Sequence, residues 1–354
     1  MSRSRTDATA PARRRRGSRL LRLVGWLNIW LMCAVWGLLW AIGETNWIGT
    51  VLTYAPRSLL CLPAAVLAIL SLRWDRRAVL LHLMAMGVVI GPIMDFVVPV
   101  QRLLDRTEPK GPRLRVITCN VQGFGEGFEA RLQEIVGLKP DLLVLQEASQ
   151  PYPALDEAFG GWHFAEAGNL RVGSRFPVRL LADLHIADFD RRAAIIVEVE
   201  TPVGTIHVAD IHQMTPRPGL ENFSREKLSS GEWGEQIQEW ENRRRKEMRA
   251  LRRAVDGAAQ GRPHIYAGDF NSPSTSPIFR NRWGDQQNAF THAGWGWGYT
   301  APCAKSDWWP ADLPWVRIDH ILCSRDWRVL DCRAGTSGGS DHRLVVADLL
   351  LLTP

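Results

Sequence analysis

The chain has 354 residues, of which 46% are hydrophobic and 23% are charged, so it is long enough for a sizeable domain and an additional segment. Its net charge of +6 comes largely from basic residues beside apolar stretches, which favours a membrane-topology signal over a nucleic-acid footprint. The six cysteines form no recognisable framework. Cys323 and Cys332 are candidates for a bridge across a hairpin, and free buried thiols are an equal alternative.

Three long apolar stretches occupy the first hundred residues. We expect transmembrane helices at about 23–42, 47–72 and 78–100, because each has about the length needed to cross a hydrocarbon core of ~30 Å. A signal peptide is a poor alternative for the first stretch, since no small-residue cleavage site follows it and two further apolar stretches do. The sequence therefore predicts a membrane domain at 23–100, a linker at 101–112 and a soluble domain at 113–354.

Basic residues flank these stretches unevenly. Segment 1–22 is rich in arginine, loop 43–46 has no basic residue, and arginines return at 73–77. Because positively charged flanks stay in the cytoplasm, we expect a multi-pass cell-membrane protein with a cytoplasmic N-terminus and an extracytoplasmic soluble domain. The basic linker at 101–115 weakly favours the opposite orientation, although large translocated domains override such charges.

Two charged residues within the stretches call for partners. Arg57 lies in the second stretch and Asp95 in the third, and both are expected at a similar depth below the outer surface. Charges inside a membrane are costly unless they are paired, so an ion pair between them is our first interpretation. An anionic lipid headgroup beside Arg57 is the alternative.

From Arg113 onward, short apolar strands alternate with helical segments, which indicates an α/β sandwich without internal repeats. A long charged helix is expected at 234–255, with Trp240, Met248 and Leu251 as candidates for its inner face. An amphipathic helix is expected at 128–138. The expected strands are 114–120, 142–145, 193–199, 205–211, 264–267, 318–323 and 344–350.

Polar side chains gather at the carboxyl ends of these strands or in the loops that follow them. Any one of them alone is by default a turn residue or a cap. Together they include two histidines and four carboxylates, which turns do not explain, so we interpret them as one converging site. They are Asn120, Glu147, His212, Asp269, Asn271, Asp319, Asp341 and His342.

Six motifs occur in the order and with the spacing of the endonuclease/exonuclease/phosphatase superfamily, which the chain resembles from about Arg113 to Leu352. They are ITCNVQG, LVLQEAS, VADIHQ, YAGDFNSPSTSP, RIDHILCS and GGSDHRLVVADL. The resemblance implies a DNase I-like four-layer α/β/β/α sandwich with its site at one rim. It also implies a hydrolase acting on phosphate esters. Hard oxygen ligands suit Mg²⁺ or Mn²⁺, and the absence of a Cys/His ligand spacing argues against zinc.

The resemblance also assigns roles to the converging residues. It implies that Glu147 is the principal metal ligand and that Asn120 and Asp341 help to hold the ion or its waters. Asp269 and Asn271 are expected to orient and deprotonate the attacking water and to bind the transition-state phosphate.

The histidines receive separate roles from the same resemblance. His342 is expected to contact the scissile phosphate with its ring held by Asp319, and His212 is the second phosphate-side histidine. Segment 166–177, where some relatives place a carboxylate partner for His212, offers no clear candidate. His320 should point to the opposite face of its strand, because neighbouring strand residues alternate.

The expected anchor favours a substrate held in the membrane. The chain resembles bacterial membrane-anchored members of the superfamily linked to glycopeptide resistance, which implies an envelope lipid such as a polyprenyl pyrophosphate. Arg217 is a candidate contact for a second phosphate, with an exposed turn arginine as an equal alternative. Trp308 and Trp309 are candidates for contact with the membrane, although core packing is the default for tryptophan.

Two further substrate classes stay open. A surface endonuclease or exonuclease acting on DNA would use the same site and would show plasmid nicking with strong salt dependence. A sphingomyelinase-like phosphodiesterase is the other alternative. Nucleic acid is the less favoured partner, because no clear basic groove accompanies the site, and no protein partner is indicated.

Overall fold

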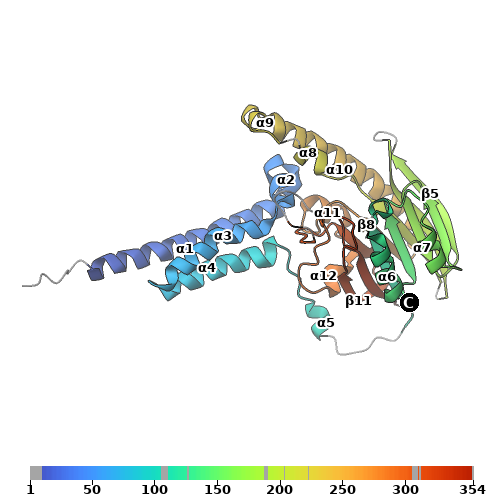
Figure 1. Ribbon diagram of the computed structural model, residues 1–354, viewed down its shortest axis with the longest axis horizontal. Coiled ribbons are helices and arrows are strands. Elements are labelled where there is room, and N and C mark those ends of the chain that lie inside the picture. Colours follow the sequence, from blue (N-terminus) through green and yellow to red (C-terminus); the bar gives the residue numbers. More distant parts are fainter. Residues whose placement is uncertain are drawn as a thin grey trace, which may run out of the picture.

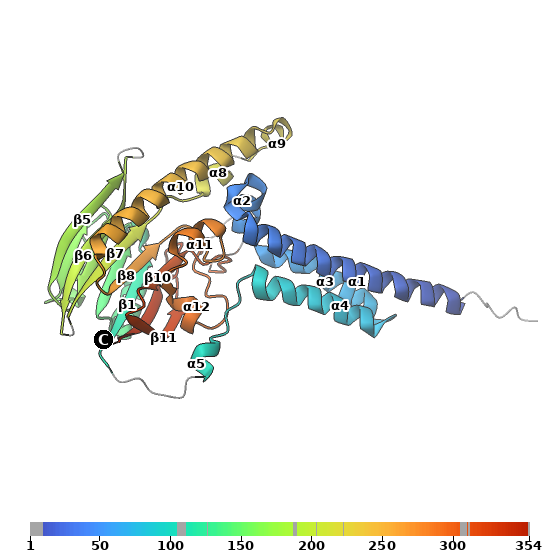
Figure 2. The ribbon, with the colours of Figure 1, turned by 180° about the vertical axis from the view of Figure 1, so that it is seen from behind.

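The computed structural model describes residues 10–104, 111–125, 127–186, 190–202, 204–221, 223–304, 310 and 312–352. A bundle of apolar helices lies at one end of the molecule and a two-sheet sandwich at the other (Figure 1). The view from behind shows the same division, with helix α10 (Glu232–Ala259) reaching back from the sandwich toward α2 (Trp47–Tyr54) (Figure 2). Trp308 and Trp309 lie outside the described residues.

Two six-stranded sheets form the middle of the sandwich. The first has the order β11-β12-β1-β2-β4-β3 and the second the order β5-β6-β7-β8-β10-β9. The strands of the first sheet are β1 (Arg113–Asn120), β2 (Leu142–Gln146), β3 (His163–Ala167), β4 (Leu170–Ser174), β11 (Trp327–Ala334) and β12 (Val345–Leu351). Those of the second are β5 (Val178–Ile186), β6 (Arg191–Thr201), β7 (Gly204–His212), β8 (His264–Asp269), β9 (Gln287–Asn288) and β10 (Asp319–Cys323).

Each sheet contains one parallel pair, and these pairs bring the site together. Strands β1 and β2 are parallel and are connected through α6 (Phe128–Leu138), while β7 and β8 are parallel and are connected through α10 (Glu232–Ala259). Parallel neighbours need such a helical crossover, and their carboxyl ends meet at one edge of the sheet. The register pairs Asn120 with Gln146 and His212 with Asp269.

Three apolar cores separate four layers. The central core, between the sheets, includes Val144, Val208 and Trp327. On the first sheet, α6 and α7 (Pro153–Ala158) contribute the core around Ile135, and on the second, α10 and α11 (Pro277–Trp283) contribute the core around Met248. This order of layers confirms the α/β/β/α sandwich. Of the residues expected on the inner face of α10, Met248 and Leu251 are buried, and Trp240 is half-buried.

Sequence patterns missed five strands, β3, β4, β5, β9 and β11. Four of them, all except β4, are the outer strands of the two sheets. An outer strand has a neighbour on one side only, so its apolar run is interrupted by exposed residues, as in β5.

Six further short helices connect these elements in the described part of the chain. They are η1 (Gly43–Thr45), η4 (Gln122–Phe124), α5 (Val100–Leu104), α8 (Arg217–Glu221), α9 (Arg225–Ser230) and α12 (Ala289–Ala293). All six cysteines are free thiols.

The apolar N-terminal region contains two helices, not three, that are long and apolar enough to cross a membrane. They are Gly17–Ala41, within α1 (Ala10–Ala41), and Arg76–Ile93, formed by α4 (Arg76–Val88) and η3 (Val89–Ile93). The stretch expected to form one transmembrane helix at 47–72 is broken into two helical segments. The chain bends there by 97° between α2 (Trp47–Tyr54) and the η2 (Arg57–Leu60) and α3 (Cys61–Leu72) segment. Pro56 lies at the bend, where proline disfavours a continuous helix. If the bent pair counts as one broken span, the total is three.

The predicted ion pair between Arg57 and Asp95 is also wrong. Arg57 donates instead to the backbone oxygens of Thr53 and Ile93, each at 2.7 Å. The third apolar helix ends at Ile93 rather than at residue 100, so Asp95 lies beyond it, with a φ of 60°. There Asp95 pairs with Arg317 of the sandwich.

Candidate active site

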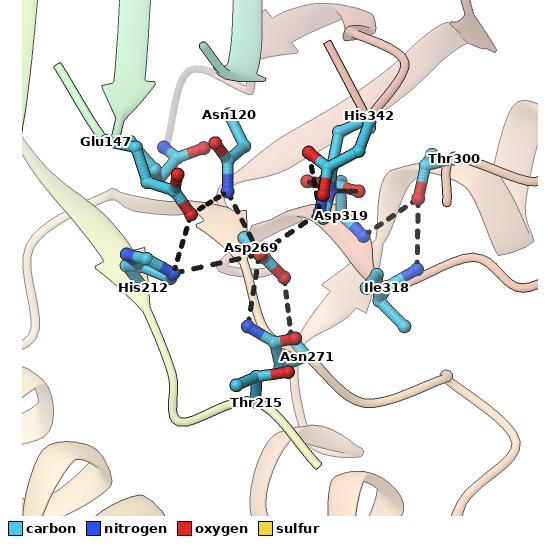
Figure 3. A network of polar contacts seen from close by, with 12 residues as sticks. Asn120, Glu147, His212, Thr215, Asp269, Asn271, Thr300, Ile318, Asp319 and His342 are labelled. Carbon is cyan, nitrogen blue, oxygen red and sulfur yellow. Dashed lines mark hydrogen bonds and ion pairs between the residues drawn. The ribbon is translucent and has the colours of Figure 1, made fainter. Parts of the chain in front are cut away.

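The residues expected to converge do lie at one edge of the sandwich, where both parallel pairs end (Figure 3). A cavity of about 410 Å³ is lined by six of them, namely Glu147, His212, Asp269, Asn271, Asp341 and His342. The other two, Asn120 and Asp319, are buried and hydrogen-bonded to cavity residues.

Asn120 connects two carboxylates across the two sheets. Its Nδ2 donates to Glu147 Oε1 at 2.9 Å and to Asp269 Oδ2 at 3.3 Å. Its Oδ1 accepts from the backbone N–H of Gln122 at 3.1 Å, which fixes the orientation of the amide. Asn120 therefore connects the carboxylate that follows β2 in the first sheet with the carboxylate that ends β8 in the second.

The GDFN turn orients Asp269. The backbone N–H of Asn271 donates to Asp269 Oδ1 at 2.8 Å, and Asn271 Nδ2 donates to Asp269 Oδ2 at 3.1 Å and to the Gln213 backbone oxygen at 2.8 Å. Only glycine fits at position 268, which has a φ of 145°, since a Cβ there would lie 1.9 Å from the Ile211 oxygen.

Two site residues have left-handed backbones, Asn271 with a φ of 47° and Glu147 with a φ of 56°. Asparagine adopts this conformation at little cost, whereas for glutamate it is strained. Such strain persists only where the surrounding structure enforces it, and it is concentrated at functional sites. At position 147 it turns the carboxylate into the cavity beside β2.

His342 and Asp319 form a buried pair. His342 Nδ1 lies 2.9 Å from Asp319 Oδ2, so its proton is held there, and Nε2 faces Asp269 Oδ2 at 3.8 Å. Burial alone would lower the pKa of His342, but the carboxylates of Asp319 and Asp269 outweigh burial and raise it to about 10. Thr300 supports the pair, because its Oγ1 accepts from the Asp319 backbone N–H at 3.3 Å.

Burial shifts two further groups of the site. It raises the pKa of Asp269 to about 7, against the opposing effect of the His342 charge. It lowers the pKa of His212 to about 3, with help from the nearby positive charges of Arg191 and His342. Near neutral pH, His212 is therefore a neutral imidazole, and Asp269 is poised between its two protonation states.

No carboxylate from segment 166–177, as the structure describes it, contacts His212. Glu166 lies 3.7 Å from Arg171 instead. The carboxylates near His212 Nε2 are Glu147 at 3.7 Å and Asp269 at 3.9 Å, and both belong to the site itself. His320, as its strand position predicted, points away from the cavity and contacts the Ser272 backbone oxygen at 3.0 Å.

Arg217 at the start of α8 lines the same cavity. Its Nη2 lies 3.1 Å from Asp341 Oδ2, and its side chain is 53% exposed. It therefore presents a positive charge at the open side of the cavity, held by one of the expected metal ligands.

Sequence reasoning missed two buried arginines that hold the site from behind. Arg131 of α6 donates to the Asn120 backbone oxygen at 3.0 Å and to that of His342. Arg244 of α10 donates to Ser272 Oγ at 2.9 Å and to the Asn271 backbone oxygen. The only available signal was a charge on the inner face of each helix, which is hard to distinguish from a solvated face.

A third missed contact comes from the apolar region. Tyr54, at the end of α2, donates from its hydroxyl to the Asn271 backbone oxygen at 2.9 Å. Asp95 accepts from Ser274 Oγ at 2.9 Å in the same loop. Two segments next to the apolar helices therefore contact the loop that carries Asn271.

The site is chemically suited to a hard divalent cation. Carboxylate oxygens of Glu147, Asp269 and Asp341 line one cavity together, and no cysteine lines it among the described residues. Ligand atoms of Asp269, Asp319 and His342 also lie within 4.8 Å of one another. In that group, Asp319 is already occupied by the His342 ring.

A model of the Endonuclease/Exonuclease/phosphatase family matches residues 117–342, more than half of the chain, while none of the curated proteins compared with it matches. Similar solved structures include truncated TDP2 from Caenorhabditis elegans, at 16% identity with a TM-score of 0.49, covering 69% of this chain and 100% of that one.

The human Nocturnin catalytic domain with bound sulfate is similar at 18% identity with a TM-score of 0.48, covering 71% of this chain and 98% of that one. The 3′ phosphatase NExo from Neisseria, bound to a product DNA hairpin, is similar at 18% identity with a TM-score of 0.46, covering 66% and 98%. From the family match, this chain belongs to the endonuclease/exonuclease/phosphatase family of divalent-metal-dependent phosphoester hydrolases.

Proposed function

We propose that the protein is a membrane-anchored phosphoesterase that hydrolyses a phosphate ester or pyrophosphate of an envelope lipid, such as a polyprenyl pyrophosphate. The observation that carries the proposal is the contact between the apolar region and the loop that carries Asn271 and Ser274, here called the catalytic loop. Tyr54 contacts Asn271, and Asp95 contacts Ser274. An enzyme with a freely diffusing substrate gains nothing from an active site built against its anchor. The glycopeptide-resistance link remains a prediction.

The proposal includes the topology predicted from charge. Residues 1–22 are cytoplasmic, the membrane domain extends over 23–100, and the catalytic domain at 113–354 lies outside the cell membrane. Large apolar side chains are exposed on α1, α3 and α4. This exposure supports a membrane around these helices, because outside a membrane the side chains would face water.

We assign the metal to the Glu147 side of the cavity. Glu147 is the principal ligand, and Asn120 and Asp341 hold the ion or its waters. Bound there, Mg²⁺ or Mn²⁺ supplies positive charge against the phosphoryl oxygens. The Asp269, Asp319 and His342 group is the less suitable holder, because the Asp319 carboxylate already accepts from His342.

Asp269 is the proposed base. Its pKa of about 7 is close to that of an efficient proton acceptor at neutral pH, and Asn271 fixes both of its oxygens. The carboxylate accepts a proton from the attacking water, and the amide of Asn271 lies where it can contact the phosphate that the water attacks.

The histidines act in different charge states. His342, kept protonated by Asp319, presents a cationic Nε2 to the scissile phosphate and to the leaving oxygen. His212 is neutral and contributes a hydrogen bond to a phosphate oxygen. Arg217, at the open side, is placed to meet a second phosphate, as a pyrophosphate substrate requires.

The test is Mg²⁺-dependent phosphate release from a long-chain polyprenyl pyrophosphate by the detergent-purified full-length protein. We expect release that is lost with a chelator and in Glu147→Ala. Sphingomyelin and plasmid DNA are assayed in parallel. Hydrolysis of one of these, with no release from the polyprenyl substrate by folded and metal-loaded protein, would overturn the lipid-pyrophosphate assignment.

A further inference from the structure

Arg57 is a buried cation without a counter-ion. Arg57 is only 9% exposed, and its guanidinium donates to two backbone oxygens, those of Thr53 and Ile93. No carboxylate in the described part of the chain lies within ion-pair distance of it. Asp95, the expected partner, is instead paired with Arg317. A buried guanidinium that lacks an anion is costly, and the structure around it leaves space for one.

That space is a cavity of about 470 Å³ between the apolar region and the sandwich. Arg57, Ser58 and Met94 line it from the apolar side, and Arg343 lines it from the sandwich side. Arg343 donates to the Asp312 backbone oxygen at 2.8 Å and, like Arg57, has no ion-paired carboxylate among the described residues. A third arginine, Arg333, also lines the cavity but pairs with Asp331 at 2.9 Å.

Aromatic side chains form much of the remaining wall. Trp295, Trp297, Tyr299 and Trp315 all line the cavity, and Trp295 is 63% exposed. Two of them are bonded to the third apolar segment: Tyr299 donates to the Met94 backbone oxygen at 2.7 Å and Trp297 to that of Ile90 at 3.2 Å. Tryptophan and tyrosine favour the boundary between headgroups and acyl chains, so this wall is suited to a membrane interface.

We propose that this junction cavity, defined by the lining residues named above, binds the phosphate headgroup of an anionic phospholipid. Arg57 and Arg343 bind the phosphate oxygens, for which the planar guanidinium is well suited, and the aromatic wall contacts the glycerol and the first part of the chains. The volume lies within the range of about 300–1,000 Å³ typical of small-molecule sites.

The junction cavity is separate from the active site. None of its lining residues lines the cavity that contains Glu147 and Asp269. The inference therefore rests on the membrane placement but not on the proposed hydrolysis, and a binding measurement tests it whether or not a polyprenyl substrate is turned over.

The experiment is native mass spectrometry of the full-length protein in detergent, titrated with phosphatidylglycerol or with phosphatidylcholine. Inorganic phosphate is added as a competitor. We expect the wild type to retain phosphatidylglycerol in preference to phosphatidylcholine, and Arg57→Gln and Arg343→Gln each to weaken that binding by about tenfold or more. The exposed Arg253 on α10 supplies the matched control, and Arg253→Gln should bind as the wild type does.

Three outcomes would overturn the proposal. The first is equal retention of the two lipids. The second is unchanged phosphatidylglycerol binding in Arg343→Gln, which changes the sandwich side and does not depend on the folding of the apolar region. The third is displacement of the lipid by millimolar inorganic phosphate, which would show that free phosphate, rather than a lipid, is the occupant.

Discussion

Removing Arg244 should loosen the catalytic loop from behind. Its guanidinium is buried and donates to both carboxylate oxygens of Glu241, at 2.7 and 2.8 Å, and to the Met214 backbone oxygen at 2.8 Å. It also bonds to Ser272 Oγ and the Asn271 backbone oxygen, and it donates to the Tyr54 hydroxyl at 3.0 Å. One side chain thus connects α10, the catalytic loop and the end of α2.

The magnitude follows from these contacts. Arg244→Met leaves Glu241, which is 1% exposed, without its counter-ion, and breaking a buried pair in this way costs about 3–5 kcal/mol. At about 2–4 °C per kcal/mol for a domain of this size, the unfolding temperature should fall by roughly 6–20 °C. Glu241→Gln combined with Arg244→Met should be less damaging, because no buried charge then lacks a partner.

The assay is thermal unfolding of the detergent-purified protein, followed by tryptophan fluorescence, together with kcat at a temperature at which the variants are folded. We expect kcat of Arg244→Met to fall by about 10²-fold, because a shift of about 1 Å in a catalytic group has that effect. An unfolding temperature within 2 °C of the wild type, or a double variant less stable than the single one, would refute the reasoning.

The remaining predictions concern pH and the anchor. Activity should fall at a pH below about 7, where Asp269 becomes protonated and loses its role as a base. The positive charge of the bound cation lowers the pKa of Asp269, so this acid limb lies below the value of about 7 for the metal-free site. Activity should fall again above about pH 10, as His342 loses its proton, and Asp319→Asn should move this alkaline limb to lower pH. The measurement is the pH profile of kcat/KM for the wild type and for Asp319→Asn, and alkaline limbs that coincide would contradict the role of the pair. Tyr54→Phe removes the hydroxyl that contacts the catalytic loop and should lower kcat by about tenfold. Tyr299→Phe, which removes a hydroxyl hydrogen-bonded to the Met94 backbone oxygen, serves as the matched control. Equal rates for the two variants would argue against positioning of the loop by the apolar region.

Much of the sandwich follows from local patterns. Most inner strands are largely apolar runs, and polar residues end or follow them, as Asp269 ends β8 and Glu147 follows β2. A pattern of this kind is visible because both faces of an inner strand are buried. The outer strands β3, β5, β9 and β11 lack it and were missed. The inner strand β4 was missed as well, because its sequence LRVGS is interrupted by an arginine and a glycine.

The apolar region was harder to predict because hydropathy reports length and composition but not direction. The stretch at 47–72 is apolar throughout apart from Arg57, yet it bends by 97°, and the third helix ends at Ile93. Because of the bend and the earlier helix end, Arg57 and Asp95 do not face each other. Arg57 donates to backbone oxygens, and Asp95 pairs with Arg317.

By itself, the sequence determined which chemical groups this protein places at the ends of its strands, because the site residues lie in short motifs whose local backbone carries them. Tertiary structure alone decided what holds those groups in place. Arg131, Arg244 and Tyr54 come from helices outside the site motifs, and each reaches a backbone oxygen of the site, Arg131 that of His342 and the other two that of Asn271. Backbone acceptors have no side-chain identity, so a sequence pattern cannot show which arginine or tyrosine will meet them. Only the packing of the layers brings the two together.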